Sequence, residues 1–315
     1  MDNISDICAN CGKGEEGSDS LKNCSACLSV KYCSRDCQIA HRPQHKYKKD
    51  CKKRAAELHD ELLFKQPPKE EEDCPICLLR IPSLPSGSKY MSCCGKSICC
   101  GCIHAVEKRT SGKGPSCPFC RTPVPIRTPT TTSDEEIIER TMKRVEAGDA
   151  HAMSNMGDYY YRGKGLPQDY DKALEFWQRA GEHGWTRAYN NIGTLYSRGE
   201  HVIMDKKKAR HYYELAAMGG NAYVRHNLGA SEAIAGNFDL AIKHWIIAVR
   251  GGFAPDLPNI QGGYSGGLIT KDVYQSALRD YQEYLIEIKS HQRDEAAAAN
   301  DRYRYYSNRM EDWGG

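Results

Sequence analysis

The chemistry that this sequence could support is concentrated near its N-terminus, because all sixteen cysteines of the 315-residue chain lie between Cys8 and Cys120. Nearly all of them occur in pairs at the spacing of metal-binding turns. No nucleophile–base pair or paired-carboxylate motif stands out, and SGKG at residues 111–114 is an incomplete phosphate-loop signature that indicates a turn. The sequence therefore predicts metal centres and no catalytic nucleophile.

The first series of candidate ligands has eight members within 44 residues. They are Cys8, Cys11, Cys24, Cys27, Cys33, Cys37, His45 and Cys51. Eight soft or borderline ligands suit two tetrahedral zinc ions. A segment this short cannot bury enough apolar surface to fold unaided, so metal binding would supply its folding free energy.

The stretch KNCSACLSVKYCSRDCQIAHRPQH within this series resembles a MYND-type zinc finger. His41 is an alternative to His45. Seven residues separate His45 from Cys37, as in the family, but five separate it from Cys51, where three are usual. Arg42 replaces the Trp of the family's peptide groove, so a structural role and a docking role both stay open. The resemblance implies interleaved sites: Cys8, Cys11, Cys33 and Cys37 on one ion, and Cys24, Cys27, His45 and Cys51 on the other.

The second series is Cys74, Cys77, Cys93, Cys94, Cys99, Cys102, Cys117 and Cys120. With CPICL at its start and CPFCR at its end, it resembles a RING finger with cysteine at all eight positions. Lys96 takes the place of the usual histidine, so Cys93 would complete the set, with His104 or Cys100 as alternatives. The resemblance implies Cys74, Cys77, Cys99 and Cys102 on one zinc ion and Cys93, Cys94, Cys117 and Cys120 on the other, hence about four zinc ions per chain.

The RING resemblance also implies an activity. A RING binds a ubiquitin-conjugating enzyme and holds its thioester-linked ubiquitin in a reactive pose, which is catalysis by positioning. Arg121 matches the cation that contacts ubiquitin and the enzyme together, and its planar fork suits several hydrogen bonds at once. Val106 is smaller than the Trp or Leu often found at its position, which would weaken binding. The enzyme-contact positions are Ile76, Val106, Pro118 and Phe119.

The cysteine-free remainder of the chain repeats itself. Gly157, Gly193 and Gly229 are 36 residues apart, as are Ala173 and Ala209, whereas Ala241 follows Ala209 by 32. A period in the mid-thirties predicts paired helices stacked as a solenoid. We expect the aromatic residues to fill the space between layers, with one repeat position shared by Trp177, Tyr212 and Trp245.

MGDYYYRGKGLPQDYDKALEFWQRAGEHG and IGTLYSRGEHVIMDKKKARHYYELAAMGG resemble Sel-one-like repeats, which are relatives of the tetratricopeptide repeat. LGASEAIAGNFDLAIKHWIIAVRGG resembles a copy with a contracted loop, and a leading half-repeat precedes the first copy. The resemblance implies a concave surface that binds proteins.

The expected fold class is multidomain, with two small zinc-stabilised fingers followed by an all-α helical-repeat solenoid. Proline-rich and charged stretches such as KQPPKEEED separate the parts. The expected boundaries are a MYND-type finger at 8–51, a helix and linker at 52–73, a RING-type finger at 74–121, a linker at 122–132, Sel-one-like repeats at 133–255, a capping helix at 256–290 and a flexible tail at 291–315.

Composition limits the class of function. No apolar run approaches the roughly 20 residues of a membrane span, and MDNISDICAN has neither the basic nor the apolar region of an export signal. We therefore expect a cytoplasmic or nuclear protein without a membrane partner, in a compartment where thiolates stay reduced. A net charge of +3 does not argue for nucleic acid, and the basic run at 42–54 is typical of a solvated helix face.

The leading hypothesis is a RING-type ubiquitin ligase without a nucleophile of its own. Its partners would be a ubiquitin-conjugating enzyme and protein substrates recruited by the helical repeats. The alternative is a non-enzymatic zinc-binding adaptor in which every module docks proteins. A nucleic-acid-associated regulator is a third hypothesis and rests only on the basic run.

Overall fold

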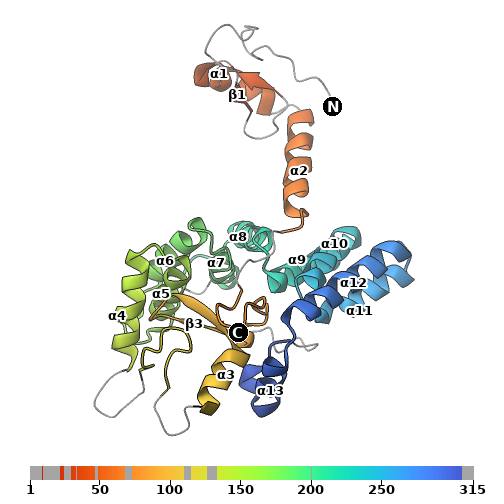
Figure 1. Ribbon diagram of the computed structural model, residues 1–315. Coiled ribbons are helices and arrows are strands. Elements are labelled where there is room, and N and C mark those ends of the chain that lie inside the picture. The colour runs from red at the N-terminus through yellow and green to blue at the C-terminus, as the bar shows by residue number, and fades with distance from the viewer. Residues whose placement is uncertain are drawn as a thin grey trace, which may run out of the picture. The chain divides into compact units, whose positions relative to one another are not determined.

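The computed structural model describes residues 9, 22–24, 30–32, 34–46, 49–67, 73–109, 115–125, 133–199 and 201–306 (Figure 1). The chain divides into two compact units, Met1–Lys65 and Gln66–Gly315, and each is described by itself. The fragment at 111–114 and most of the predicted linker at 122–132 lie outside the described residues. No helix in the described ranges is both long and apolar enough to cross a bilayer.

The first unit is a small cysteine-containing fold followed by a helix. Its strands β1 (Lys22–Asn23) and β2 (Lys31–Tyr32) pair antiparallel, and α1 (Arg35–Lys46) and α2 (Lys49–Leu63) follow. Its described core is one small cluster of Cys24, Tyr32 and Cys51. Such a core is too small to stabilise a fold without cross-links or metal.

The second unit begins with the second cysteine module, which we define as residues 74–121. A short 3₁₀ turn, η1 (Pro85–Gly87), leads into an antiparallel hairpin of β3 (Ser88–Met91) and β4 (Lys96–Cys99). The helix α3 (Cys100–Arg109) follows directly. Three cysteines therefore sit at the end of β4 and in the first turn of α3, which fixes their relative positions.

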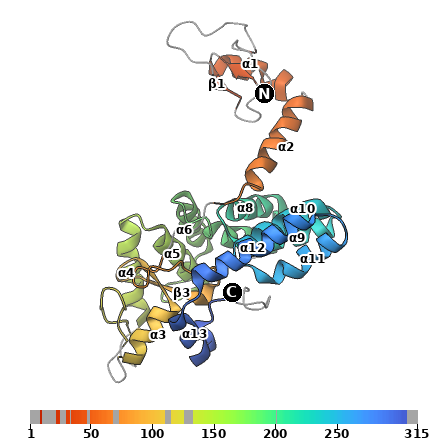
Figure 2. The same cartoon turned by 45° about the vertical axis from the view of Figure 1, so that its right-hand side comes forward.

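The remainder of the second unit is helical, and the helices stack as successive pairs (Figure 2). Aspartates cap the repeat helices: Asp149 accepts from the amide of Ala152 and Asp169 from that of Lys172, which satisfies otherwise unpaired first-turn donors. The helices are α4 (Ser133–Glu146), α5 (Ala150–Arg162), α6 (Tyr170–Glu182), α7 (Ala188–Arg198), α8 (Lys206–Met218), α9 (Ala222–Ile234), α10 (Phe238–Arg250), α11 (Leu257–Ser265), α12 (Lys271–Ile288) and α13 (His291–Ala299), with 3₁₀ turns η2 (Ala254–Asp256) and η3 (Asp301–Tyr303).

The repeat period corresponds to one packing contact. In each pair, a glycine of the first helix lies against an aromatic ring of the second: Gly157 against Trp177, and Gly229 against Trp245. In the middle pair Gly193 faces Tyr213, so the prediction of Tyr212 at this position was wrong by one residue. The contracted third copy, α9 with α10, reproduces the contact of the first two.

Turns between successive pairs form a row at the same repeat interval. Gly148, Gly184, Gly220 and Gly252 have φ values of 80°, 96°, 98° and 95°, in the left-handed region that glycine adopts without strain. We call these four the inter-repeat turns. Each precedes a helix pair, and its amide donates to a carbonyl in the last turn of the helix before it, as in Gly184 to Gly181 and Gly220 to Ala217.

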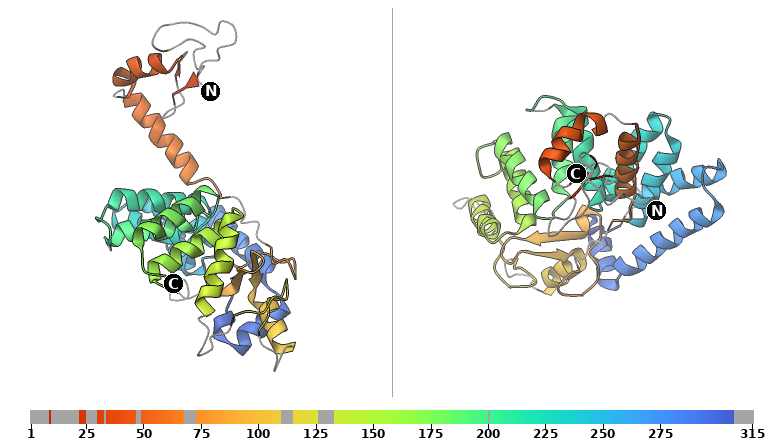
Figure 3. Two further views of the ribbon diagram at one scale, coloured as in Figure 1. Left: turned by 90° about the vertical axis from the view of Figure 1, so that its left-hand side faces the viewer. Right: turned by 90° about the horizontal axis from the view of Figure 1, so that it is seen from above.

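The second cysteine module lies within the curve of the repeat helices, as the right-hand view of Figure 3 shows. Its residues 80–91, which we call the docking segment, meet the inter-repeat turns and the helices beside them. The Ser83 hydroxyl donates to the Gly251 carbonyl at 2.8 Å, and the Tyr90 hydroxyl donates to the Asp149 carboxylate at 2.6 Å. Leu84 is buried in a cluster with Ala222, Ala248 and Phe253. The finger and the solenoid, expected as separate modules, thus form one compact unit.

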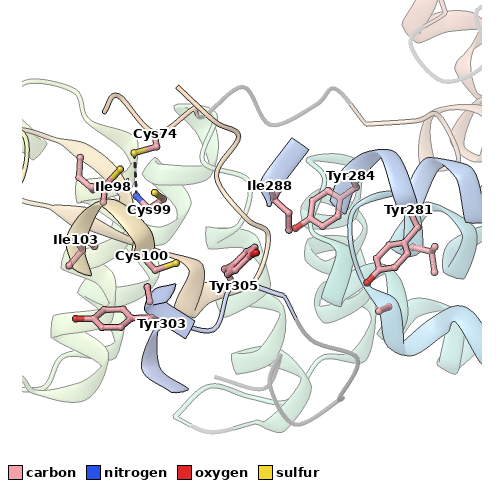
Figure 4. Close-up of a cluster of buried hydrophobic side chains, with 14 of the residues drawn as sticks. Cys74, Ile98, Cys99, Cys100, Ile103, Tyr281, Tyr284, Ile288, Tyr303 and Tyr305 are labelled. Carbon is pink, nitrogen blue, oxygen red and sulfur yellow. Dashed lines mark hydrogen bonds between the residues drawn. The ribbon is translucent and has the colours of Figure 1, made fainter. Parts of the chain in front are cut away.

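The C-terminal region differs from the expectation in two ways. The predicted capping segment 256–290 contains two helices, α11 and α12. Residues 291–306, expected to begin a flexible tail, instead form α13 and η3, and Tyr303 and Tyr305 are buried in the same cluster as Ile98 of the second cysteine module (Figure 4). The cause is long-range packing. The sequence of α13 is largely polar, but its Arg293 and Ala296 are buried where the helix packs against α3.

We expect Gly157→Ala to destabilise the protein, because an added Cβ would lie 2.4 Å from the Trp177 ring. Overpacking of this kind costs about 1–3 kcal/mol, which a urea unfolding curve would measure. Gly262→Ala is the matched control, since a Cβ at this helical glycine in α11 meets nothing within 4 Å. This variant should gain about 0.5–1 kcal/mol from helix propensity. Equal stability of the two variants would contradict the proposed packing contact.

Candidate metal centres

Two matching backbone turns shape the second cysteine module. In one, the amide of Leu78 donates to the Cys74 carbonyl at 2.8 Å; in the other, the amide of Arg121 donates to the Cys117 carbonyl at 2.9 Å. Leu78 and Arg121 have φ values of 58° and 62°, a left-handed conformation that costs a side-chain-bearing residue of order 1 kcal/mol. Each turn therefore points two thiols, three residues apart, toward the same space.

Eight thiols gather into two groups of four. Cys74 and Cys77 meet Cys99 and Cys102, and within each group the ligand atoms all lie within 4.8 Å of one another. The second group is Cys93, Cys94, Cys117 and Cys120. The groups interleave along the chain, in the combinations that the sequence predicted.

The spacing within the groups suits a tetrahedral ion. The Sγ atoms of Cys77 and Cys99 are 3.7 Å apart, and those of Cys94 and Cys117 are 3.8 Å apart. An ideal tetrahedron with zinc–sulfur bonds of about 2.3 Å has edges of about 3.8 Å. A disulfide would require about 2.05 Å, and all the cysteines of these groups are free thiols. Each group offers four sulfur donors in an arrangement that fits one zinc ion. The eight thiols would therefore hold two ions.

Protonation opposes metal binding at Cys93 and Cys94 of the second group. Burial raises the pKa of Cys93, and burial raises the pKa of Cys94 to about 11. These thiols are therefore protonated at neutral pH when no ion is present. A bound dication would displace their protons, because the thiolate is the form that ligates a metal.

The alternative ligands in the second cysteine module lie outside both groups. Cys100 is buried in the apolar cluster beside α3, and the His104 ring packs against the Tyr303 ring with centroids 5.5 Å apart. Lys96 is exposed at the start of β4. The structure thus brings Cys93, and neither alternative, into the second group.

The first cysteine module (residues 8–51) is only partly described. Cys24 and Cys51, predicted to share an ion, lie in one buried cluster, and Cys37 is half-buried against it. The His41 Nδ1 atom lies 3.1 Å from the Tyr32 hydroxyl. Cys8, Cys11, Cys27, Cys33 and the side chain of His45 lie outside the described residues, so this ligand set stays a prediction.

The predicted enzyme-contact positions lie on the two cysteine turns and on α3. Ile76 and Phe119 occupy equivalent places in the two turns and are 42% and 46% exposed, and Leu78 beside the first turn is 75% exposed. Arg121 is exposed, whereas Pro118 and Val106 are half-buried. The two turns therefore leave the side chains of Ile76 and Phe119 accessible to a partner.

The helix α13 covers one face of α3. Lys108 forms an ion pair with Glu295 at 2.5 Å, and Glu107 pairs with Arg302 at 3.0 Å. Gly101 lies so close to Arg293 that an added Cβ would be 2.9 Å from its amide nitrogen. Val106 lies on the other side of the helix from His104 and Lys108, because two residues correspond to about 200° of rotation. Helix α13 therefore packs against the side of α3 that carries Gly101 and Lys108, and the predicted contact residue Val106 lies on the opposite side.

One residue of this site was missed by sequence reasoning. Arg293 of α13 is 0% exposed and reaches into the second cysteine module. Its Nη1 atom donates to the carbonyls of Arg80 and Ile288, at 2.8 and 2.6 Å. Its Nη2 atom donates to the Leu79 carbonyl at 3.3 Å and lies 3.8 Å from the Cys77 Sγ atom. An arginine in a polar, alanine-rich stretch carries no sequence signal for such a position.

Known proteins resemble separate parts of this chain. Residues 8–51 match the MYND finger family, and residues 150–185 and 186–221 match the Sel1 repeat family. The chain thus carries a zinc-finger region of the MYND type at its N-terminus, followed by a Sel1-type helical-repeat region. The contracted third copy is not matched.

Over 52 residues, 16% of this chain, the sequence is 44% identical to the E3 ubiquitin-protein ligase DA2 of Arabidopsis thaliana and to the E3 ubiquitin-protein ligase GW2 of Oryza sativa. The match spans 12% and 11% of those two proteins.

Among solved structures, a Sel1 repeat protein from Oxalobacter formigenes is 27% identical, with a TM-score of 0.38 over 52% of this chain and 64% of that chain. The protective antigen c5321 of uropathogenic Escherichia coli, described as an SLR fold, is 20% identical, with a TM-score of 0.40 over 57% of this chain and 39% of that one.

Elemental analysis of the purified protein should give about four zinc ions per chain, two in each cysteine module. Cys93→Ser should lower this value by one, because it removes a thiol of the second group. Lys96→Ala is the control and should lose none, since a solvated ammonium has no free lone pair. Metal loss in the Lys96 variant with a silent Cys93→Ser would reverse the assignment, and a wild-type content near two would mean that one module holds no metal.

Proposed function

We propose that this protein is a RING-type ubiquitin ligase whose second cysteine module positions a ubiquitin-conjugating enzyme. The observation that carries the proposal is the interleaving of two four-thiol groups, with exposed Ile76 and Phe119 on the turns between paired cysteines. The 44% identity over 52 residues to proteins named as E3 ubiquitin ligases supports the same reading.

The protein would contribute no bond-making group of its own. Zinc, when bound, would act as a structural ion that fixes the two turns. Ile76, Pro118 and Phe119 would supply the apolar contact to the conjugating enzyme, with Val106 on α3 beside them. Arg121 would donate hydrogen bonds to enzyme and ubiquitin together, restricting the thioester to a reactive geometry.

The Sel1-type repeats would recruit the protein substrate, since stacked repeats of this kind offer extended binding surfaces. The docking segment is bonded to Gly251 and Asp149 at the edge of the solenoid that carries the inter-repeat turns, so we place the substrate elsewhere on the repeats. Large apolar side chains are exposed at the loops on the far ends of the helix pairs, including Ile203 at 91% and Ile234 at 89%.

Ile76→Ala should weaken binding of a conjugating enzyme by roughly 1–3 kcal/mol, because it removes a half-exposed apolar anchor. Titration calorimetry with the purified enzyme would measure the change. Ile286→Ala is the matched control, since this isoleucine is 76% exposed on α12, far along the chain from the cysteine turns. The proposed contact would be wrong if both variants bound with wild-type affinity.

Arg121→Ala should leave enzyme binding nearly intact and slow ubiquitin transfer, because its proposed contacts exist mainly in the closed, reactive complex. Single-turnover discharge of the ubiquitin thioester would measure this. Leu78→Ala, at the equivalent left-handed position of the other turn, controls for truncation in a strained backbone and should discharge at the wild-type rate. Equal rates for wild type and the Arg121 variant would remove Arg121 from the mechanism.

An autoubiquitination assay with a broad panel of conjugating enzymes tests the activity itself. If the intact, fully zinc-loaded protein stimulates none of them, the ligase proposal fails. The non-enzymatic adaptor then remains, and it makes its own demand: partners captured by the repeats should be retained with no change in their ubiquitination.

A further inference from the structure

Arg293 carries a buried charge without a carboxylate to balance it. Its guanidinium is 0% exposed, and within the described part of the chain its hydrogen-bond partners are three carbonyl oxygens and the Cys77 Sγ atom. Its Nε atom has no partner there. Moving a cation into a protein interior is costly unless an anion or several strong acceptors lie beside it. Carbonyl dipoles offset part of that cost, but they do not neutralise a full charge.

The first thiol group supplies the missing anion when it holds zinc. Four thiolates and one dication carry a net charge of −2, and one of the four sulfurs, Cys77 Sγ, lies 3.8 Å from the Arg293 Nη2 atom. We propose that Arg293 is the counter-cation and positioning residue of the centre formed by Cys74, Cys77, Cys99 and Cys102. Through it, metal occupancy is coupled to the docking of α13.

The second thiol group is supported differently. The Arg144 Nη2 atom donates to the Cys93 carbonyl at 2.8 Å, and Arg144 is partly exposed. Water can therefore solvate the Arg144 charge, and its bond to a carbonyl needs no metal. Arg293 has no such access to solvent, so the two centres should differ in how far they depend on an arginine from the helical region.

The coupling acts in both directions. Zinc holds its cysteine ligands as thiolates, so loss of the ion would remove the anionic centre beside the buried Arg293 guanidinium, whose Nη2 atom lies 3.8 Å from the Cys77 Sγ atom. Undocking of α13 would return the Arg293 charge to water and so remove the cost of burying it. It would also expose the face of α3 around Gly101 and His104. With zinc, the charge pair should slow release of the ion, as outer-shell partners of metal ligands commonly change metal affinity by about 10- to 100-fold.

Zinc release and site-resolved cysteine alkylation test the proposal on the full-length, zinc-loaded protein. Under challenge with a chelator, Arg293→Met should speed alkylation of Cys74, Cys77, Cys99 and Cys102 about tenfold or more. Alkylation of the second group should be unchanged. Arg293→Lys, which keeps the charge and loses the planar fork, should fall between wild type and Arg293→Met.

Arg225→Met is the matched control. Arg225 is also 0% exposed, but its side-chain partners in the described part of the chain are the Ala217 carbonyl of α8 and His244 of α10, neither of which is a thiol. This variant should lower the thermal midpoint and leave zinc release unchanged. If Arg293→Met behaves as Arg225→Met does, with a lower midpoint and wild-type alkylation of the first group, Arg293 is a structural residue only and the proposal fails.

A measurement on the wild type keeps the proposal testable if Arg293→Met does not fold. Chelation should remove hydrogen-exchange protection from α13 and leave α5–α8 protected. Full protection of α13 after loss of zinc from the first group would overturn the coupling. The inference rests on zinc in the second cysteine module and not on ligase activity, so an inactive protein that holds about four zinc ions would contradict only the ligase proposal.

Discussion

The contact between the docking segment and the inter-repeat turns is the interaction on which the second unit depends. A cysteine module of about fifty residues cannot bury enough apolar surface to be stable alone. Here it lays Leu84 into a cluster with Ala222, Ala248 and Phe253 and hydrogen-bonds Ser83 to the backbone of Gly251. The repeat architecture makes this possible, because turns between helix pairs recur at a regular interval and the last of them offers the Gly251 carbonyl to Ser83. The docking segment would therefore be held in two ways: by metal ligation at the cysteines that flank it in the sequence, and by its contacts with the repeats.

Local spacing was enough to predict much of this structure. The 36-residue interval between Gly157 and Gly193 predicted the helix pairs. The interval recurs because one glycine in each repeat packs against one aromatic ring. The groups around Cys74 and Cys93 followed from ligand pairs and from the RING resemblance. The error at Tyr212 shows the limit of the period: a one-residue shift turns a helical side chain by about 100°, and only the position four residues after Ala209 faces Gly193.

The sequence could not predict how the modules meet. Ser83 bonds to a residue 168 positions away, and Arg293 reaches Cys77 across 216 positions. Such contacts produce neither a periodic pattern nor a compositional bias in the sequence, because each joins two single residues that lie far apart along the chain. The segment around Arg293 contains four consecutive alanines and many charges, which are typical of a solvated end. Tertiary packing overrode that signal by burying Arg293, Ala296 and Tyr303 on one side of α13 and η3.

This arrangement constrains how a ligase of this design could choose its substrates. The docking segment is bonded to Asp149 and Gly251 at the edge of the solenoid that carries the inter-repeat turns, so this edge supports the cysteine module. Substrates would be left with the far loops, where side chains such as Ile203 and Ile234 are exposed. Because the second cysteine module and the repeats share buried residues, removing the repeats would deprive Leu84 and Tyr90 of their partners and would disturb the two cysteine turns as well. Recruitment and transfer would then be separable by point substitutions on the far loops, and not by deletion of a domain.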